Sequence, residues 1–103
     1  MKIYRQGDVM MIEVKKIPAG LTELKLDGPV ILAYGEVTGH KHQFMDAMDV
    51  RMWGGGAGPR YLEVAGIKML MHEEHSTVEL PPGRYLIPQQ VEYTPAELHR
   101  VAD

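Results

Sequence analysis

The chain has 103 residues, of which 45% are hydrophobic and 24% are charged, and its formal net charge is −3 at pH 7. These values predict a single folded domain over residues 1–103, and the lack of a basic excess argues against nucleic acid as a partner. The sequence contains no cysteine, which excludes disulfides, thiolate metal ligands and cysteine nucleophiles.

The first residues lack the apolar core of a signal peptide. No apolar run approaches the roughly 20 residues that a membrane-spanning helix needs. We therefore expect a cytoplasmic protein with no membrane partner, in a bacterial cell or in one infected by a phage.

Short apolar runs separated by turn residues fill the first third of the chain. After a turn at Gly7-Asp8, residues 9–14 predict a mostly buried strand. Residues 21–26 alternate and predict a short strand, and residues 30–34 predict another apolar one.

The middle of the chain is ambiguous. Met45, Met48 and Met52 have helical spacing, which indicates a short apolar face or a loop packed on the core. A Met-x-x-Met site for soft copper is the alternative. The glycine-rich residues 54–58 predict a loop or hairpin tip rather than a phosphate cradle, because no Lys-Ser/Thr ending and no helix follow.

The last third predicts four strands and one helix. The strands are expected at residues 61–64, 67–71, 77–80 and 84–87, and Thr94, Pro95 and Glu97 form a capping pattern for a helix over residues 94–101. Together these elements predict an all-β fold, a small single-domain β-barrel or β-sandwich with a short C-terminal helix.

Four of the five histidines form two close pairs, one at His40 and His42 and the other at His72 and His75. Imidazole is the commonest protein ligand for a borderline transition metal. On a strand the first pair projects from one face. That face also carries Glu36, Thr38 and Phe44. It is too polar for an ordinary core and suits the mouth of a barrel that holds an ion; a solvated strand face is the alternative.

The second pair can meet one ion only if the strand register breaks. His72 and His75 are three apart, so in an unbroken strand they point to opposite faces, whereas a turn or bulge at Glu73-Glu74 brings them together. We expect His40, His42 and His75 as ligands around one open position, with His72 as a conditional fourth. Hydrogen-bonded or surface histidines are the alternative. His99, on the expected helix, is predicted to be structural or solvated.

The ion expected at such a site is a divalent transition metal, with Zn first and Mn, Fe, Ni or Cu as alternatives. Glu73 and Glu74 supply a catalytic hypothesis of the hydrolase type, in which the ion acidifies a bound water and a carboxylate takes its proton. Two solvated turn residues are the simpler interpretation. The sequence leaves open whether the protein is an enzyme.

Two resemblances bear on these histidines. Residues 35–42 (GEVTGHKH), followed later by Pro-Gly turns and strands, resemble the cupin pattern. That resemblance implies a small β-barrel in which His40, His42, a glutamate and one further histidine hold a metal. Residues 4–9, 35–42 and 72–85 (YRQGDV, GEVTGHKH and HEEHSTVELPPGRY) also resemble a group of small uncharacterised bacterial and phage proteins. This second resemblance implies that the histidine pairs act as one unit, and it supplies no activity.

The alternative function is a non-enzymatic binding protein, such as a phage or prophage factor that engages a host protein. Small β proteins with open strand edges often self-associate, so we expect a homo-oligomer. A third hypothesis is a small anionic ligand contacted by histidine and by Arg60 or Arg84.

Overall fold

Ten β-strands and no helix make up the part of the chain that the computed structural model describes, which is residues 1–35, 39–54 and 58–88. The strands are β1 (Ile3–Gln6), β2 (Val9–Val14), β3 (Glu23–Leu24), β4 (Val30–Tyr34), β5 (Lys41–Phe44), β6 (Val50–Gly54), β7 (Arg60–Val64), β8 (Lys68–Leu70), β9 (Val78–Leu80) and β10 (Gly83–Ile87). The all-β prediction is therefore confirmed. The helix expected at residues 94–101, with His99, lies outside the described residues, as do Glu36 and Thr38.

Six strands form one antiparallel sheet in the order β1-β2-β10-β7-β6-β3. β1 and β3 are its two edges, so among the described residues the sheet does not close on itself. The prediction of a closed barrel is therefore wrong. The sheet stays open because its edge strand β3 pairs with β6 through only Glu23 and Leu24 and is too short to carry the sheet round to β1.

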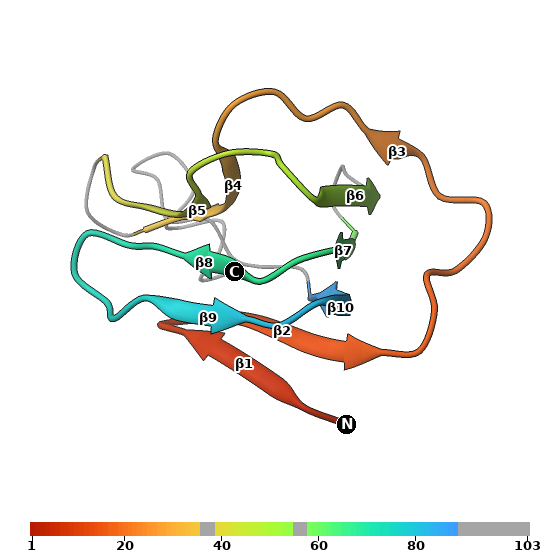
Figure 1. Ribbon diagram of the computed structural model, residues 1–103, viewed down its shortest axis with the longest axis horizontal. Coiled ribbons are helices and arrows are strands. Elements are labelled where there is room, and N and C mark those ends of the chain that lie inside the picture. The colour runs from red at the N-terminus through yellow and green to blue at the C-terminus, as the bar shows by residue number, and fades with distance from the viewer. Residues whose placement is uncertain (36–38, 55–57, 89–103) are drawn as a thin grey trace, which may run out of the picture.

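The remaining strands form two hairpins, β4 with β5 and β8 with β9. Reciprocal hydrogen bonds between the backbones of Gln43 and Met71, with N···O distances of 3.0 and 2.8 Å, join β5 to β8. Figure 1 shows β8 and β9 lying between β5 on one side and β1 on the other. The two hairpins thus bridge from β5 towards the β1 edge of the large sheet.

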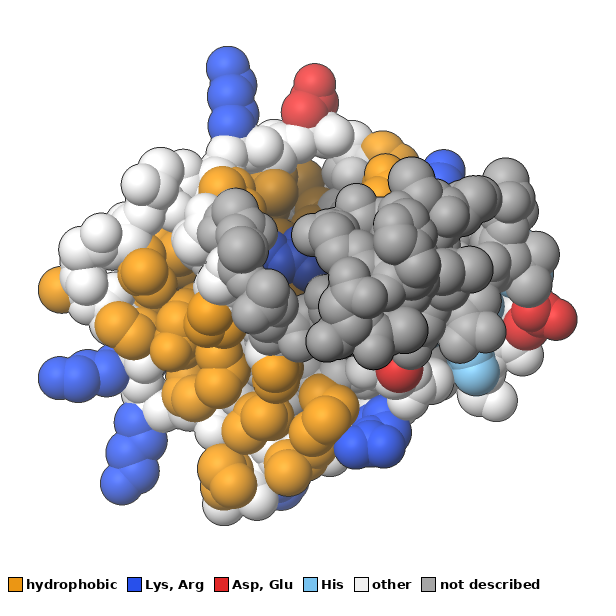
Figure 2. Space-filling model, turned by 180° about the vertical axis from the view of Figure 1, so that it is seen from behind, with side chains coloured by type: hydrophobic (Ala, Val, Ile, Leu, Met, Phe, Trp, Pro, Cys, Tyr) orange, Lys and Arg blue, Asp and Glu red, His pale blue; other side chains and the backbone are white. Residues whose placement is uncertain are grey.

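Alternate residues of the strands turn inward to one hydrophobic core. In β2, Val9 and Met11 are fully buried while Met10 and Ile12 are half-buried. Full burial of such side chains stabilises the fold by about 1.5–3 kcal/mol each. Figure 2, seen from behind, shows hydrophobic side chains gathered on one side of the molecule. The core residues are Val9, Met11, Val30, Leu32, Phe44, Val50, Met52, Leu62, Val64, Leu70, Leu80, Tyr85 and Ile87.

The middle of the chain corrects the methionine prediction. Met52 is buried within β6, whereas Met45 and Met48 are exposed in the turn that precedes this strand. The three residues therefore form neither a helical apolar face nor a loop packed on the core, because strand pairing of β6 with β7 sets the side-chain period at two. β1 and β6 were not predicted. Over the described ranges, no helix is long and apolar enough to span a membrane.

Candidate metal centre

The four paired histidines meet at one end of the molecule, where the β1–β2 turn, the start of β5 and the β8–β9 turn lie together (Figure 1). The ring centroid of His72 lies 5.5 Å from that of His40, 4.3 Å from that of His42 and 4.7 Å from that of His75. His42 and His75 are stacked with centroids 5.8 Å apart. The residue that the sequence placed last among the ligands, His72, is therefore the one in contact with the other three.

The β8–β9 turn contains the register break that the second pair needs. β8 ends at Leu70 and the chain bends over residues 73–75. The backbone N–H groups of Glu74 and His75 donate to Nδ1 of His72 at 3.0 and 3.2 Å. This side-chain cap closes the turn and directs the rings of His72 and His75 towards one another.

His42 enters the cluster from the inward face of β5, next to Phe44, and both side chains are buried. Its Nδ1 lies 2.9 Å from Oε1 of Gln6, which is also buried. Nε2 of Gln6 donates to the carbonyls of Leu70 at 2.8 Å and Ser76 at 2.9 Å. The amide oxygen of Gln6 can therefore only accept, so His42 carries its proton on Nδ1 and keeps a lone pair on Nε2.

Burial also keeps His42 neutral. Desolvation is the main cause that lowers the pKa of His42, and the neighbouring His72 and His75 lower it further. The carboxylates of Asp8 and Glu73 act in the opposite direction without reversing the shift. Nε2 of His42 lies 3.8 Å from Oδ1 of Asp8. A neutral imidazole is the protonation state that binds metal ions.

One group within the cluster could hold a metal ion, namely His40, His72 and Glu73. One ligand atom from each lies within 4.8 Å of the other two. Ligands at about 2.0–2.2 Å from a tetrahedral ion stand roughly 3.5 Å apart, so distances of up to 4.8 Å within the group would shorten by up to about 1.3 Å on binding. Such a movement is small for side chains at a turn.

The imidazole of His40 has a buried polar atom without a hydrogen bond. Its Nδ1 lies 3.2 Å from Oε1 of the exposed Glu74 without forming a hydrogen bond with it. Within the described residues this is the one buried side-chain nitrogen or oxygen left unsatisfied. A buried unsatisfied nitrogen calls for an explanation, and an ion is one.

The two glutamates of the turn differ in what they contact. Oε1 of Glu73 accepts a hydrogen bond from the backbone N–H of Lys41 at 2.9 Å, and this bond is the main cause that lowers the pKa of Glu73. Glu73 is thus tied to β5 as an ionised carboxylate. Glu74 stands beside His40 and is solvent-exposed. The catalytic role of either glutamate stays a prediction.

Sequence reasoning missed three residues of this site. A Cβ on Gly7 would lie 2.8 Å from Nε2 of His75, and a Cβ on Gly35 would lie 3.1 Å from Nε2 of His72, so these glycines make room for the rings. The third is Gln6, next to what the sequence indicated only as a turn. The feature that could have indicated Gln6 is a polar side chain at an inward-facing position of a short strand.

No curated protein and no solved structure matches the chain. A family described as "Domain of unknown function (DUF8820)" matches residues 5–90. The match spans the four clustered histidines, both glutamates of the turn and Gln6. Because it covers most of the 103 residues, the chain belongs to the DUF8820 family.

Proposed function

We propose that this protein binds a divalent transition metal in its histidine cluster, with His40, His72 and Glu73 as ligands. The observation that carries the proposal is the group of three ligand atoms within 4.8 Å of one another. The unsatisfied Nδ1 of His40 supports it. Two imidazoles and a carboxylate suit Zn, with Mn, Fe, Ni or Cu as alternatives.

The proposed ligand set differs from the set expected from spacing, which favoured His40, His42 and His75. His72 takes precedence because its ring contacts all three other rings. His42 and His75 line the cluster, and the lone pair on Nε2 of His42 makes it the first candidate for a further ligand. Three protein ligands leave one position of a tetrahedral ion for water or a substrate.

A metal-dependent hydrolase is the second candidate function. The observation that favours it is the exposed carboxylate of Glu74, 3.2 Å from Nδ1 of His40. A carboxylate beside the ion can take a proton from a bound water and pass it to a leaving group. Glu73 is better suited to ligation than to proton transfer, since it belongs to the candidate ligand group.

Three expectations remain predictions: the resemblance to cupins, self-association, and the phage or prophage binding role.

The two arginines expected to bind an anionic ligand contact groups of this chain. Arg60 donates to the carbonyls of Ile31 and Leu32, and Arg84 donates to Oε2 of Glu63 at 2.8 Å. An anion would have to compete with these contacts, so the metal hypothesis has the stronger support.

Metal content and Co(II) absorption of the tag-free protein test the proposal. We expect one equivalent of Zn to bind, and bound Co(II) to give visible bands of a low-coordinate nitrogen and oxygen site. His72→Gln and Glu73→Gln should lose the bands, whereas Glu79→Gln, the same change at an exposed residue of β9, should keep them.

Two results would overturn parts of this proposal separately. Metal that stays substoichiometric after reconstitution of the folded protein contradicts metal binding itself. Full metal binding by His72→Gln and Glu73→Gln, together with its loss in His75→Gln, contradicts the ligand assignment and returns it to the set expected from spacing. Circular dichroism of each variant checks that the strands are intact.

A further inference from the structure

A second group of possible metal ligands lies on the other face of the strands that carry the histidines. The chain has eight methionines, and Met45, Met48, Met69 and Met71 have exposed fractions between 40% and 71%. Three of them, all but Met48, belong to the outward face of β5 and β8 or directly continue it. Apolar side chains gathered in solvent on one face call for a functional explanation.

The register between β5 and β8 places these methionines. Gln43 pairs with Met71 in an antiparallel bridge. Three residues after Gln43 and three residues before Met71, Oδ1 of Asp46 and Nζ of Lys68 form an ion pair at 2.6 Å. Both contacts fit one antiparallel register, since each step forward on one chain is a step backward on the other.

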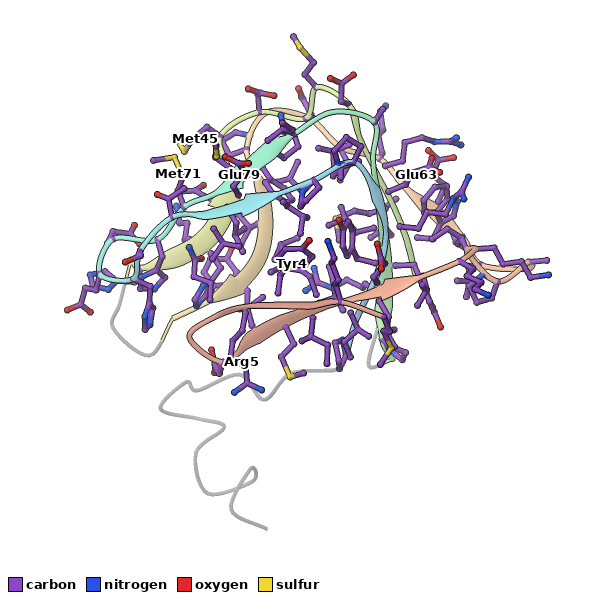
Figure 3. The ribbon with its side chains drawn as sticks, turned by 60° about the horizontal axis from the view of Figure 1, so that its bottom comes forward. Tyr4, Arg5, Met45, Glu63, Met71 and Glu79 are labelled. Atoms are coloured by element: carbon purple, nitrogen blue, oxygen red, sulfur yellow. The ribbon has the colours of Figure 1, made fainter. Side chains whose placement is uncertain are left out.

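Met69 and Met71 are two apart and lie on the same outward face of β8 and its continuation, where neighbouring side chains of one strand are about 7 Å apart. Met45 directly follows β5, two residues after Gln43, which is the partner of Met71. Figure 3 shows Met45 and Met71 together with Glu79 on this side of the strands. Glu79 pairs with Met69, so a carboxylate borders the three side chains.

We propose that Met45, Met69 and Met71 form a binding site for Cu(I). Thioether sulfur is a soft ligand that selects Cu(I) over harder divalent ions, and the three rotatable bonds of each methionine let sulfurs from adjacent strands converge on one ion. The chain offers no cysteine, so methionine is its only source of sulfur ligands. The carboxylate of Glu79 adds a negative charge beside the cation.

This site is independent of the histidine cluster. His42 is buried on the inward face of β5, whereas Gln43 and Met45 lie on the outward side. Met48 is excluded because it lies in the turn beyond Asp46, where its backbone N–H donates to that carboxylate at 2.9 Å. A borderline ion such as Zn prefers the imidazole ligands of the histidines, and a soft ion prefers the thioethers.

Methionine methyl NMR of the full chain tests the site. Protein labelled with carbon-13 at the methionine methyl groups is titrated with Ag(I), a redox-inert substitute for Cu(I), and the endpoint is repeated with Cu(I) without oxygen. We expect the signals of Met45, Met69 and Met71 to shift together and saturate at one equivalent. The buried Met11 and Met52 should not move, and Zn should not shift the three signals together.

Variants complete the experiment. Met69→Leu and Met71→Leu keep side-chain volume and should each abolish the saturable shift of the remaining two signals. Met10→Leu, the same change on β2, should leave it intact. Methionine signals that do not shift, or that shift for all exposed methionines without saturation, overturn the site. The readout on methionine separates this site from the histidine cluster, whose metal binding is measured by Co(II) absorption.

Discussion

Nδ1 of His42 donates a hydrogen bond to Oε1 of Gln6 at 2.9 Å, and neither side chain is accessible to solvent. Gln6 also donates to the carbonyls of Leu70 and Ser76 on either side of the β8–β9 turn. One amide group therefore orients the buried imidazole and anchors the turn that carries His72. Through this turn, Gln6 positions the candidate ligands His72 and Glu73 without touching the ion.

Replacing Gln6 by Leu should weaken Zn binding, because Gln6 anchors both ends of the turn that carries His72 and Glu73. It should also lower the free energy of unfolding by about 1–3 kcal/mol, because the buried groups of His42 and Leu70 and the part-buried carbonyl of Ser76 lose their partner. Metal titration and urea unfolding measure the two effects. Gln43→Leu is the matched control, since Gln43 joins β5 to β8 through its backbone. Equal effects of the two substitutions on Zn affinity would remove the positioning role of Gln6.

Metal binding at His72 should disturb the turn that this residue caps. Its Nδ1 accepts the backbone N–H groups of Glu74 and His75, so a neutral ring carries its proton on Nε2. Ligation through Nε2 moves the proton to Nδ1, and ligation through Nδ1 displaces both donors. Either way, Zn should shift the amide nitrogen and proton signals of Glu74 and His75. Amide signals that stay fixed at saturating Zn would show that His72 is not a ligand.

Gly7→Ala should impair the cluster beyond the cost of its backbone conformation. Gly7 and Gly28 both have positive φ, 59° and 73°, and a side chain in this region costs about 1–2 kcal/mol. A Cβ at Gly28 meets open space, whereas one at Gly7 lies 2.8 Å from Nε2 of His75. We expect both variants to lose stability in urea. Gly7→Ala alone should weaken Zn binding, because a displaced His75 ring presses on the ring of the candidate ligand His72, whose centroid lies 4.7 Å away. If Gly28→Ala weakens Zn binding as much, the contact with His75 has no role.

Stability should fall at alkaline pH because of Tyr85. Burial, with Tyr4 and Glu13 nearby, raises the pKa of Tyr85 to about 12, above the value of about 10 for an unfolded chain. The folded state therefore holds this proton more tightly. The resulting stability is fully present below about pH 10 and is lost as the pH rises through about 12.

Urea unfolding between neutral and alkaline pH measures this effect. Tyr85→Phe should be about 1 kcal/mol less stable at neutral pH, because the carbonyl of Pro81 loses its donor. The variant should also lose less stability on alkaline titration. Tyr34→Phe, the same change at an exposed tyrosine, is the matched control. An alkaline loss that Tyr85→Phe leaves undiminished would assign it to other groups.

The sequence predicted the strands whose side chains pack as continuous apolar runs. Residues 9–14 and 30–34 have the predicted bounds, since Val, Ile, Leu and Met there fill the core. β6 was not predicted because Met48 and Met52 are four residues apart, which is a helical spacing. The pattern that corresponds to the strand is the alternation of buried and exposed residues through Val50 and Met52. The open edge at β3 follows from a pairing of two residues. No local sequence pattern predicts the residue at which strand pairing stops.

The candidate metal centre was likewise predictable only in part. The His-x-His pair and the register break at the second pair could be predicted, because both depend on strand parity over a few residues. The central position of His72 could not, since it follows from contacts between β5 and the β8–β9 turn. Gln6 was missed because its partners are 36, 64 and 70 residues away along the chain. Its role is visible only after the strands are placed.

The bond from Gln6 to Ser76 also has a consequence for the order of events in folding. It closes most of the chain into one loop, and such distant contacts form late because ordering the intervening residues costs entropy before any contact repays it. A nascent chain that has not yet released β8 and β9 holds His40, His42 and Gln6, but it lacks His72, Glu73 and the two carbonyls that anchor the amide of Gln6. The complete histidine cluster is thus a feature of the finished fold, and its assembly reports that Gln6 and Ser76 have met.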